Sequence, residues 1–180
     1  MRYGKSLEDF ILSLKGGVFF LSPREKLFLA FLDEMGLPED VLREGVEDCY
    51  RAVDPRKRSR YPLFLCMRPI MEAYERFLRL EAQKGGLDWK RRFQKKLALA
   101  KKYLKTGAVE PASEEEAHKL LKELERRIVR KLWKSMDEEE KRRIKEKYRE
   151  FERNRSLYSE LIKEEVKRIH GVPNLSLYVD

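Results

Sequence analysis

Helix start signals recur along the 180-residue chain and constrain its fold more than any other feature. In four stretches a serine or aspartate is followed three residues later by an acid, which is typical of a helix N-terminus. They are Ser6–Asp9, Ser22–Glu25, Ser113–Glu116 and Asp137–Glu140. Between them, apolar residues recur every three or four positions, as on one face of a helix. No segment is a convincing strand, although residues 17–22 are compatible with extended backbone. The sequence therefore predicts an all-α protein.

The first half of the chain is expected to form a compact helical domain over residues 1–86. Its helices are predicted over 7–15, 23–35, 38–53 and 62–84, with glycine pairs or prolines at several of their ends. Gly45 lies on the apolar stripe of the third helix, which predicts close contact with a neighbouring helix. Residues 63–67 are apolar all round and are expected to be buried on all sides. Pro69 should kink the fourth helix or start it afresh.

The second portion, residues 87–180, is expected to contain a basic helix over 89–105 followed by a long antiparallel helical hairpin. The hairpin would pair a helix over 114–135 with one over 137–170 in coiled-coil-like packing. If unbroken, the last helix would span about 33 residues and about 50 Å. Asn154 to Ser156 interrupts its apolar rhythm and predicts a break or a kink. The nearly uncharged tail, residues 172–180, should dock on apolar surface. The two portions are separate domains or share one core.

Charge is abundant and unevenly distributed. The net charge is +9; residues 1–90 hold 16 Lys and Arg against 15 Asp and Glu, whereas residues 91–180 hold 25 against 17. Uncharged polar residues are scarce, with two Asn, two Gln and one Thr. This composition suits a hyperthermophile, in which thermolabile amides are rare and surface ion pairs are common. A charged surface is therefore the default for this chain and is not by itself a sign of function.

The basic helix carries the strongest functional signal. Residues 90–105 contain eight cations and no acid, and a helical wheel places six of the cations away from the apolar face that includes Phe93 and Leu97. The six are Lys90, Arg91, Lys95, Lys101, Lys102 and Lys105. Arg92 and Lys96 flank the apolar face. The pattern predicts phosphate contacts with DNA or RNA. One alternative is that the helix is solvated and its cations are neutralised by acids of neighbouring helices. Another is that the helix binds an anionic membrane surface, which is disfavoured because its apolar face is needed for the core.

Two other basic runs are weaker signals. Arg126, Arg127 and Arg130 extend the predicted nucleic-acid surface, although cations near a helix C-terminus are favoured by the helix dipole alone. The run Arg56 to Arg60 is interpreted as a solvated turn between helices, or otherwise as a phosphate contact. It lacks the interleaved aromatic residues of a base-stacking platform.

The run from Ser22 to Phe77 resembles the helical domain of DnaD-type replication proteins. A capped helix, a second helix and a basic turn precede a helix with an aromatic start. The resemblance covers less than a third of the chain, and no functional residue is transferred from that family. It favours an association with nucleic acid.

No catalytic motif, phosphate-binding loop or metal-ligand spacing occurs, so an enzyme, a cofactor and a metal site are not expected. Cys49 and Cys66 are expected to be free buried thiols, or a pair if a hyperthermophile permits a cytoplasmic disulfide. No signal peptide and no apolar run long enough to span a membrane is evident, which favours the cytoplasm and no membrane partner.

These observations predict a non-enzymatic helical binding protein. The leading hypothesis is sequence-independent association with nucleic acid through the basic helix. The alternative is a protein-interaction or self-association module that uses the long hairpin and the C-terminal tail.

Overall fold

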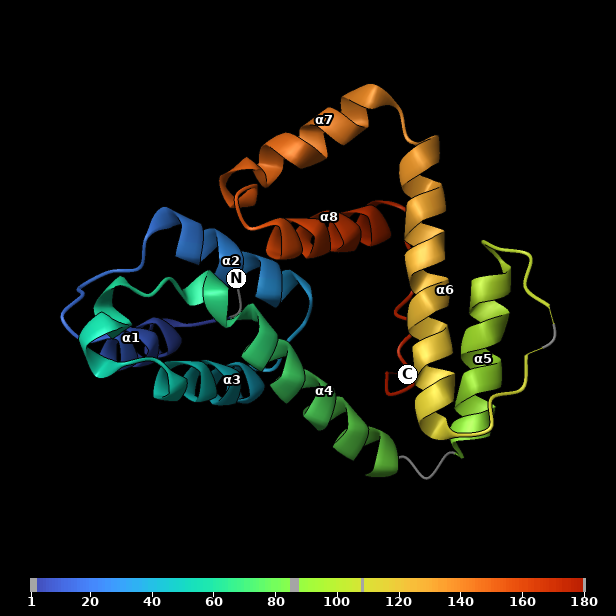
Figure 1. Cartoon of the computed structure of the whole chain (residues 1–180), viewed down its shortest axis with the longest axis horizontal. Coiled ribbons are helices and arrows are strands. Elements are labelled where there is room, and N and C mark those ends of the chain that lie inside the picture. Colours follow the sequence, from blue (N-terminus) through green and yellow to red (C-terminus); the bar gives the residue numbers. More distant parts are fainter. Residues whose placement is uncertain (1–2, 85–87, 108, 180) are drawn as a thin grey trace. The chain divides into compact units, whose positions relative to one another are not determined.

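A computed structural model describes residues 3–84, 88–107 and 109–179. Within these ranges all regular structure is helical and no strand occurs, which confirms the all-α class. The chain divides into two compact units, residues 1–77 and residues 78–180 (Figure 1). The division lies inside a helix, whereas the boundary expected at residues 86–87 lies outside the described residues. Each unit is described by itself.

Unit 1 contains three α-helices, two short 3₁₀ helices and the first part of a fourth α-helix. In chain order these are α1 (Lys5–Lys15), α2 (Pro23–Glu34), α3 (Glu39–Ala52), η1 (Pro55–Arg60), η2 (Leu63–Cys66) and α4 (Met67–Lys84). Their apolar faces form one core. Its fully buried members include Leu7 and Ile11 from α1, Phe28 and Leu32 from α2, and Leu42 and Val46 from α3.

Local capping chemistry explains where α2 begins. The Ser22 hydroxyl accepts a hydrogen bond from the backbone N–H of Glu25 at 3.3 Å, and the Glu25 carboxylate accepts one from the backbone N–H of Ser22 at 2.8 Å. This is the predicted reciprocal capping box. The predicted cap at Ser6 is wrong, because α1 already begins at Lys5 and its N-cap is Gly4. Gly16 ends α1 as predicted, with a φ of +64°.

The segment predicted as one helix from Pro62 is divided. It forms η2 and then α4, in which Pro69 is the third residue and needs no backbone N–H. The alternative that proline starts the helix afresh is thus confirmed. Leu63 is buried, but Leu65 is 41% exposed, so the predicted burial on all sides is wrong for Leu65.

Two contacts join α3 to the segment that follows it. Gly45 meets the backbone of α4 at Ile70, which confirms the close helix contact predicted from its position. Cys49 and Cys66 form a disulfide, with their Cα atoms 5.5 Å apart. The expectation of free thiols is therefore wrong, and the pairing left as the alternative is correct. Both sulfur atoms lie in the core because each cysteine occupies the buried face of its element.

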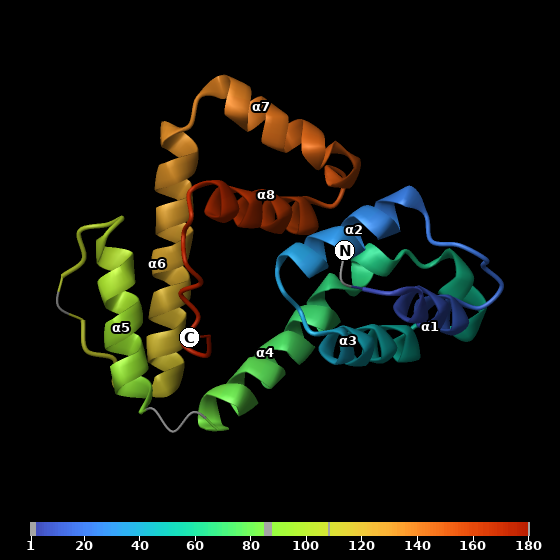
Figure 2. The same cartoon turned by 180° about the vertical axis from the view of Figure 1, so that it is seen from behind.

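Unit 2 contains the rest of α4 and four more α-helices. They are α5 (Trp89–Lys101), α6 (Glu114–Ser135), α7 (Glu138–Lys147) and α8 (Arg155–Ile169), with the 3₁₀ turn η3 (Arg149–Phe151) before α8. Figures 1 and 2 show α5 and α6 side by side. The two helices run parallel: Arg92, early in α5, lies 3.7 Å from Glu114, and Lys131, late in α6, donates a hydrogen bond to the carbonyl oxygen of Tyr103.

The single helix predicted over residues 137–170 does not form. α7 ends at Lys147, and a new helix begins after Asn154, whose side chain accepts a hydrogen bond from the backbone N–H of Leu157 at 3.2 Å. The break predicted at Asn154 is thereby confirmed. The expected hairpin of two long helices is not confirmed, because α6 packs against α5 and α8, and α7 packs against α8.

The C-terminal tail folds back on unit 2, as predicted. Val172, Leu175, Leu177 and Tyr178 are buried in a core with residues of α5 and α6. Leu78 and Ala82 of α4 pack against the same core, which explains why unit 2 begins inside α4.

Candidate nucleic-acid interface

The apolar side of α5 fixes which of its cations face water. Phe93, Leu97 and Ala100 are buried against α6 and the tail. Arg92 and Lys96 are buried as well, because they flank this apolar side. The Lys96 ammonium donates a hydrogen bond to the carbonyl oxygen of Asn174 at 3.0 Å. These two cations therefore serve the packing of unit 2 and are not available to a ligand.

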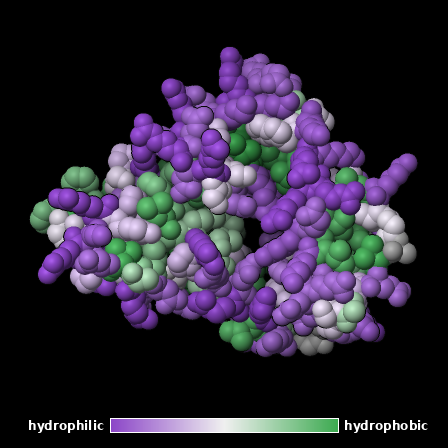
Figure 3. All heavy atoms as spheres, viewed as in Figure 1, coloured by the Kyte–Doolittle hydropathy of each residue, from purple (hydrophilic) through white to green (hydrophobic). Residues whose placement is uncertain are grey.

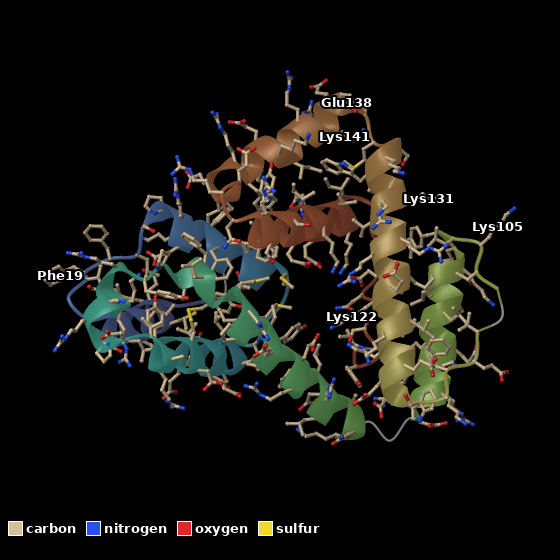
Figure 4. The ribbon with its side chains drawn as sticks, viewed as in Figure 1. Phe19, Lys105, Lys122, Lys131, Glu138 and Lys141 are labelled. Carbon is tan, nitrogen blue, oxygen red and sulfur yellow. A yellow bond between two sulfur atoms is a disulfide. The ribbon has the colours of Figure 1, made fainter. Side chains whose placement is uncertain are left out.

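The other six cations, all predicted as site residues, are exposed. Four lie on α5, and two follow its last residue (Figure 4 labels Lys105, which points away from the ribbon). The six are Lys90, Arg91, Lys95, Lys101, Lys102 and Lys105. In the part of the chain that the structure describes, no carboxylate lies within 4.0 Å of any of them. Lys90 contacts the ring of Trp89, with its ammonium 5.6 Å from the ring centre.

Exposed cations elsewhere on the helices commonly have a carboxylate partner. Arg51 pairs with Glu47 at 2.7 Å, Arg68 with Glu72 at 2.9 Å and Arg143 with Glu139 at 2.6 Å. Each pair spans one turn of its own helix. The six exposed cations on and just after α5 differ because the helix itself contains no acid and no carboxylate of the described residues lies within 4.0 Å of them. The competing interpretation, neutralisation by a neighbouring helix, applies to the buried Arg92, which lies 3.7 Å from Glu114 of α6. Among the described residues it has no ion pair to support it at the six exposed cations.

The structure divides the three predicted arginines of α6 between two sides of that helix. Arg127 lies one turn before Lys131, which donates a hydrogen bond to the carbonyl oxygen of Tyr103 just after α5, so Arg127 is on the α5 side. Arg126 and Arg130 instead line a groove of about 490 Å³ between α6 and α8, where Val129 and Trp133 provide apolar lining. The predicted set is therefore divided: Arg127 is on the same side of α6 as α5, whereas Arg126 and Arg130 line the groove.

The basic run at residues 56–60 forms the exposed 3₁₀ turn η1. Asp54 caps it by accepting a hydrogen bond from the backbone N–H of Arg56 at 2.9 Å. The Arg58 side chain donates to the carbonyl oxygen of Val53. The run is solvent-exposed, which agrees with the interpretation as a solvated turn and leaves Arg56, Lys57 and Arg60 accessible.

Three buried carboxylates organise the interior, and each has a pKa below its usual value. Burial alone would raise the pKa of Glu165, but hydrogen bonds from Arg168, Lys147 and Tyr148 outweigh burial and hold the pKa at about 2. In the same way, Lys167 and Lys163 lower the pKa of Glu125.

Glu25 is the third of these carboxylates. Burial favours its neutral form, but hydrogen bonds from Lys15 and from the backbone N–H groups of Leu63 and Ser22 lower its pKa. Carboxylates of this kind stay ionised at neutral pH and are weak bases, so their evident role is to hold cations and backbone N–H groups together.

No group of three or more His, Cys, Asp or Glu side chains in the described ranges is arranged to hold a metal ion. His118 instead packs against the ring of Tyr178, with the two ring centres 4.7 Å apart.

Sequence reasoning missed an aromatic pair. Phe19 and Phe20 lie in residues 17–22, which the sequence shows only to be compatible with extended backbone, and they are the most exposed large apolar residues of the described chain, at 91% and 72%. The available signal was their position shortly after Gly16 and Gly17, with only Val18 between, in a segment without helical periodicity.

Comparisons with known proteins place the chain in a family. A protein-family model described as "Uncharacterised protein" matches residues 2–86. A protein of Aquifex aeolicus (strain VF5), described as "Uncharacterized protein", is 45% identical over 175 residues, which cover 97% of this chain and 99% of the relative. The chain belongs to the same family as this Aquifex protein. No solved structure matches the chain.

The two matches differ in what they cover. The family model spans unit 1 and α4, and it stops before α5. The Aquifex relative is similar across nearly the whole chain, so the family relationship includes the basic helix and the rest of unit 2. Neither description names a ligand, a reaction or a partner. Within the described residues, no helix is both long enough and apolar enough to cross a membrane.

Proposed function

We propose that the protein is a non-enzymatic helical binding protein that associates with nucleic acid, independently of sequence, through the outer side of α5. The observation that supports this proposal is the set of six exposed cations on α5 and the turn after it, none of which has a carboxylate within 4.0 Å among the described residues. Cations without internal partners attract external anions, and nucleic-acid backbones present phosphates at close, regular spacing.

The mechanism would be release of counterions from the backbone. α5 has 13 residues and is about 20 Å long, so its cations can reach several phosphates of one duplex. Arg127, on the α5 side of α6, extends the same surface. Unit 2 as a whole is basic, with 28 Lys and Arg against 19 Asp and Glu, whereas residues 1–77 contain 13 of each. Long-range attraction would therefore guide nucleic acid to unit 2.

Binding of a labelled duplex at several salt concentrations tests the proposal. A plot of the logarithm of the binding constant against that of the salt concentration should have a slope of up to about −5 if all six cations contact phosphates. The triple variant Lys95→Gln, Lys101→Gln and Lys102→Gln should reduce the magnitude of that slope by about 3.

The matched control removes three paired, exposed cations: Arg51→Gln, Arg68→Gln and Arg143→Gln. This control changes the net charge equally, and its slope should differ from the wild-type slope by less than about 1. Negligible duplex binding at about 50 mM salt, or equal effects of the two triple variants, would contradict the proposal.

A second candidate function is protein interaction or self-association. The groove between α6 and α8 supports it, because Trp133, Val129 and Ile162 offer apolar surface there. The tail does not, since its apolar side chains are used within unit 2. Sedimentation of the wild type and of Trp133→Glu tests this candidate. The wild type is expected to self-associate and the variant to be monomeric. A wild type that is monomeric at all concentrations would contradict self-association.

A cytoplasmic location in a hyperthermophile is part of our proposal. Nucleic acid is present in the cytoplasm, and the scarcity of Asn, Gln and Thr suits growth at high temperature. The Cys49–Cys66 disulfide is compatible with this location because intracellular proteins of hyperthermophiles are an exception to the rarity of cytoplasmic disulfides.

A further inference from the structure

The loop between α1 and α2, residues 16–22, exposes two adjacent phenylalanines. Gly16 and Gly17 have φ values of +64° and +66°, which turn the chain away from α1 before the pair. Phe19 is 91% exposed and Phe20 is 72% exposed. Figure 4 shows Phe19 at the outer edge of unit 1, pointing away from the ribbon, and Figure 3 shows hydrophobic surface at this edge next to hydrophilic side chains. Single exposed apolar residues are common, but two adjacent and nearly bare aromatic rings indicate a contact surface.

The base of this loop is fixed although its tip is exposed. Lys15, just before the loop, forms a buried ion pair with Glu25, just after it, at 2.5 Å. The Glu25 carboxylate also accepts hydrogen bonds from the backbone N–H and the hydroxyl of Ser22, the last residue of the loop. Both ends of the loop therefore meet at one buried carboxylate, which restricts where the two rings can lie.

The same carboxylate also holds the chain that follows η1. Glu25 accepts a hydrogen bond from the backbone N–H of Leu63 at 3.0 Å, and Lys15 donates one to the carbonyl oxygen of Tyr61 at 3.0 Å. The η1 turn ends at Arg60, the residue directly before Tyr61, and it packs against α1. The aromatic loop and the basic turn thus extend from one buried junction.

The η1 turn is the local cationic surface of an otherwise balanced unit. Residues 1–77 contain 13 Lys and Arg and 13 Asp and Glu. η1 holds four of these cations within six residues, and the side chain of the adjacent Asp54 is engaged as its cap. Arg56, Lys57 and Arg60 are exposed, and no carboxylate among the described residues lies within 4.0 Å of them.

We infer that the loop 16–22 and the η1 turn together form a binding site for single-stranded nucleic acid. Phe19 and Phe20 stack on unpaired bases, while Arg56, Lys57 and Arg60 contact the flanking phosphates. Aromatic rings beside a cationic surface are the general means by which proteins hold single strands, because every base has a face on which a ring can stack. The inference goes beyond the proposed function, since it assigns a second site, in unit 1, that requires unpaired bases.

The structure favours a nucleic-acid strand over a lipid surface as the occupant. Interfacial membrane binding usually needs the apolar face of an amphipathic helix. The apolar face of α1 is used in the core, where Leu7 and Ile11 are buried, so only the two rings would enter a bilayer. Two rings are a marginal membrane anchor, but they match two stacked bases.

Binding of an oligothymidylate strand to the full-length protein tests the inference. Phe19→Ser with Phe20→Ser should weaken binding of the strand by at least about 10-fold, because stacking contributes about 1–3 kcal/mol per base. Binding of a duplex should stay within about twofold, since its bases are already stacked. The matched control, Leu80→Ser with Ile169→Ser, removes two other exposed apolar side chains and should leave both affinities unchanged.

The basic turn is tested separately. Arg56→Gln, Lys57→Gln and Arg60→Gln together should reduce the magnitude of the salt slope for the single strand by about 2. The α5 triple variant reports on the proposed function independently, because it should weaken duplex binding and leave the effect of the phenylalanine variant in place.

Three results would overturn the inference. The first is wild-type protein that does not bind the strand, and the second is a phenylalanine variant that binds it as tightly as the wild type. The third is a phenylalanine variant that no longer binds phosphatidylserine-containing vesicles but binds the strand as the wild type does. That result would assign the surface to a membrane.

Discussion

Gly45 of α3 and Ile70 of α4 pack backbone against backbone. A methyl group placed on Gly45 would lie 2.5 Å from the Cα of Ile70 and 3.0 Å from its backbone nitrogen. These atoms cannot move without shifting α4, so no side chain larger than hydrogen fits at position 45. The contact brings α4 against α3 in the core of unit 1.

Gly45→Ala should therefore destabilise unit 1 by about 1–3 kcal/mol, because the cost of overpacking exceeds the gain in helix propensity of about 1 kcal/mol. Urea denaturation followed by circular dichroism measures the change. Gly107→Ala is the control, since a methyl group there meets nothing within 4 Å. An alanine at position 45 that leaves the free energy of unfolding unchanged, or raises it, would contradict the close packing.

The Cys49–Cys66 disulfide should stabilise unit 1 mainly by restricting its unfolded chain. The bond closes a loop with a sequence separation of 17, which corresponds to about 3 kcal/mol in the loop-entropy estimate. Cys49→Ala with Cys66→Ala should lower the unfolding free energy by that amount, and dithiothreitol should lower the wild-type value in the same way. If dithiothreitol has no effect on the wild type, or if it affects the double variant as well, this account is wrong.

Most features with a local cause were predicted correctly from the sequence, the cap at Ser6 being the exception because α1 begins at Lys5. The caps at Ser22, Ser113 and Asp137 depend on side chains that reach a backbone N–H three residues away, and all three form. The break at Asn154 was also predicted from a local feature, because the apolar periodicity of the sequence is interrupted there. The separation of the six outer cations of α5 from Arg92 and Lys96 follows from helical periodicity alone.

Features that depend on distant parts of the chain were not predicted. Glu25 was recognised as a capping residue, but its bond to Leu63 joins residues 38 positions apart. The parallel arrangement of α5 and α6 rests on contacts between residues far apart in the sequence, such as those of Arg92 with Glu114 and of Lys131 with Tyr103. The absence of ion-pair partners for the six exposed cations on and just after α5 could not be predicted either, because the positions of neighbouring acids are set by tertiary packing.

Glu165 should make the stability of unit 2 depend on pH in the acid range. The pKa of this carboxyl in the folded protein, about 2, is below the ordinary value of 4.5. Its ionised form is therefore preferred in the folded state, and its contribution is complete above about pH 4.5 and lost as the pH falls towards 2. The contribution is about 2–3 kcal/mol. It reflects hydrogen bonds from Tyr148, Lys147 and Arg168.

Glu165→Gln keeps the size of the side chain and removes its charge. Urea denaturation between about pH 6 and about pH 3 should show a lower unfolding free energy for the variant at the upper end and a smaller difference from the wild type at the lower end. Tyr148→Phe serves as a second test, because it removes one hydrogen bond to Glu165 and should weaken the same pH dependence. Parallel curves for the wild type and Glu165→Gln would show that another group titrates.

The C-terminal tail should contribute to the stability of unit 2 through its buried side chains. Leu177 is fully buried among apolar residues of α5 and α6, and the adjoining backbone is held by a hydrogen bond from Leu175 to the Glu125 carboxylate at 3.2 Å. Leu177→Ala should therefore lower the unfolding free energy by about 2–5 kcal/mol. Val179→Ala, at a half-buried position two residues later, should cost less than about 1 kcal/mol. Equal and small effects of both changes on the urea midpoint would mean that the tail is not part of the core in solution, and its apolar side chains would then be available to a partner.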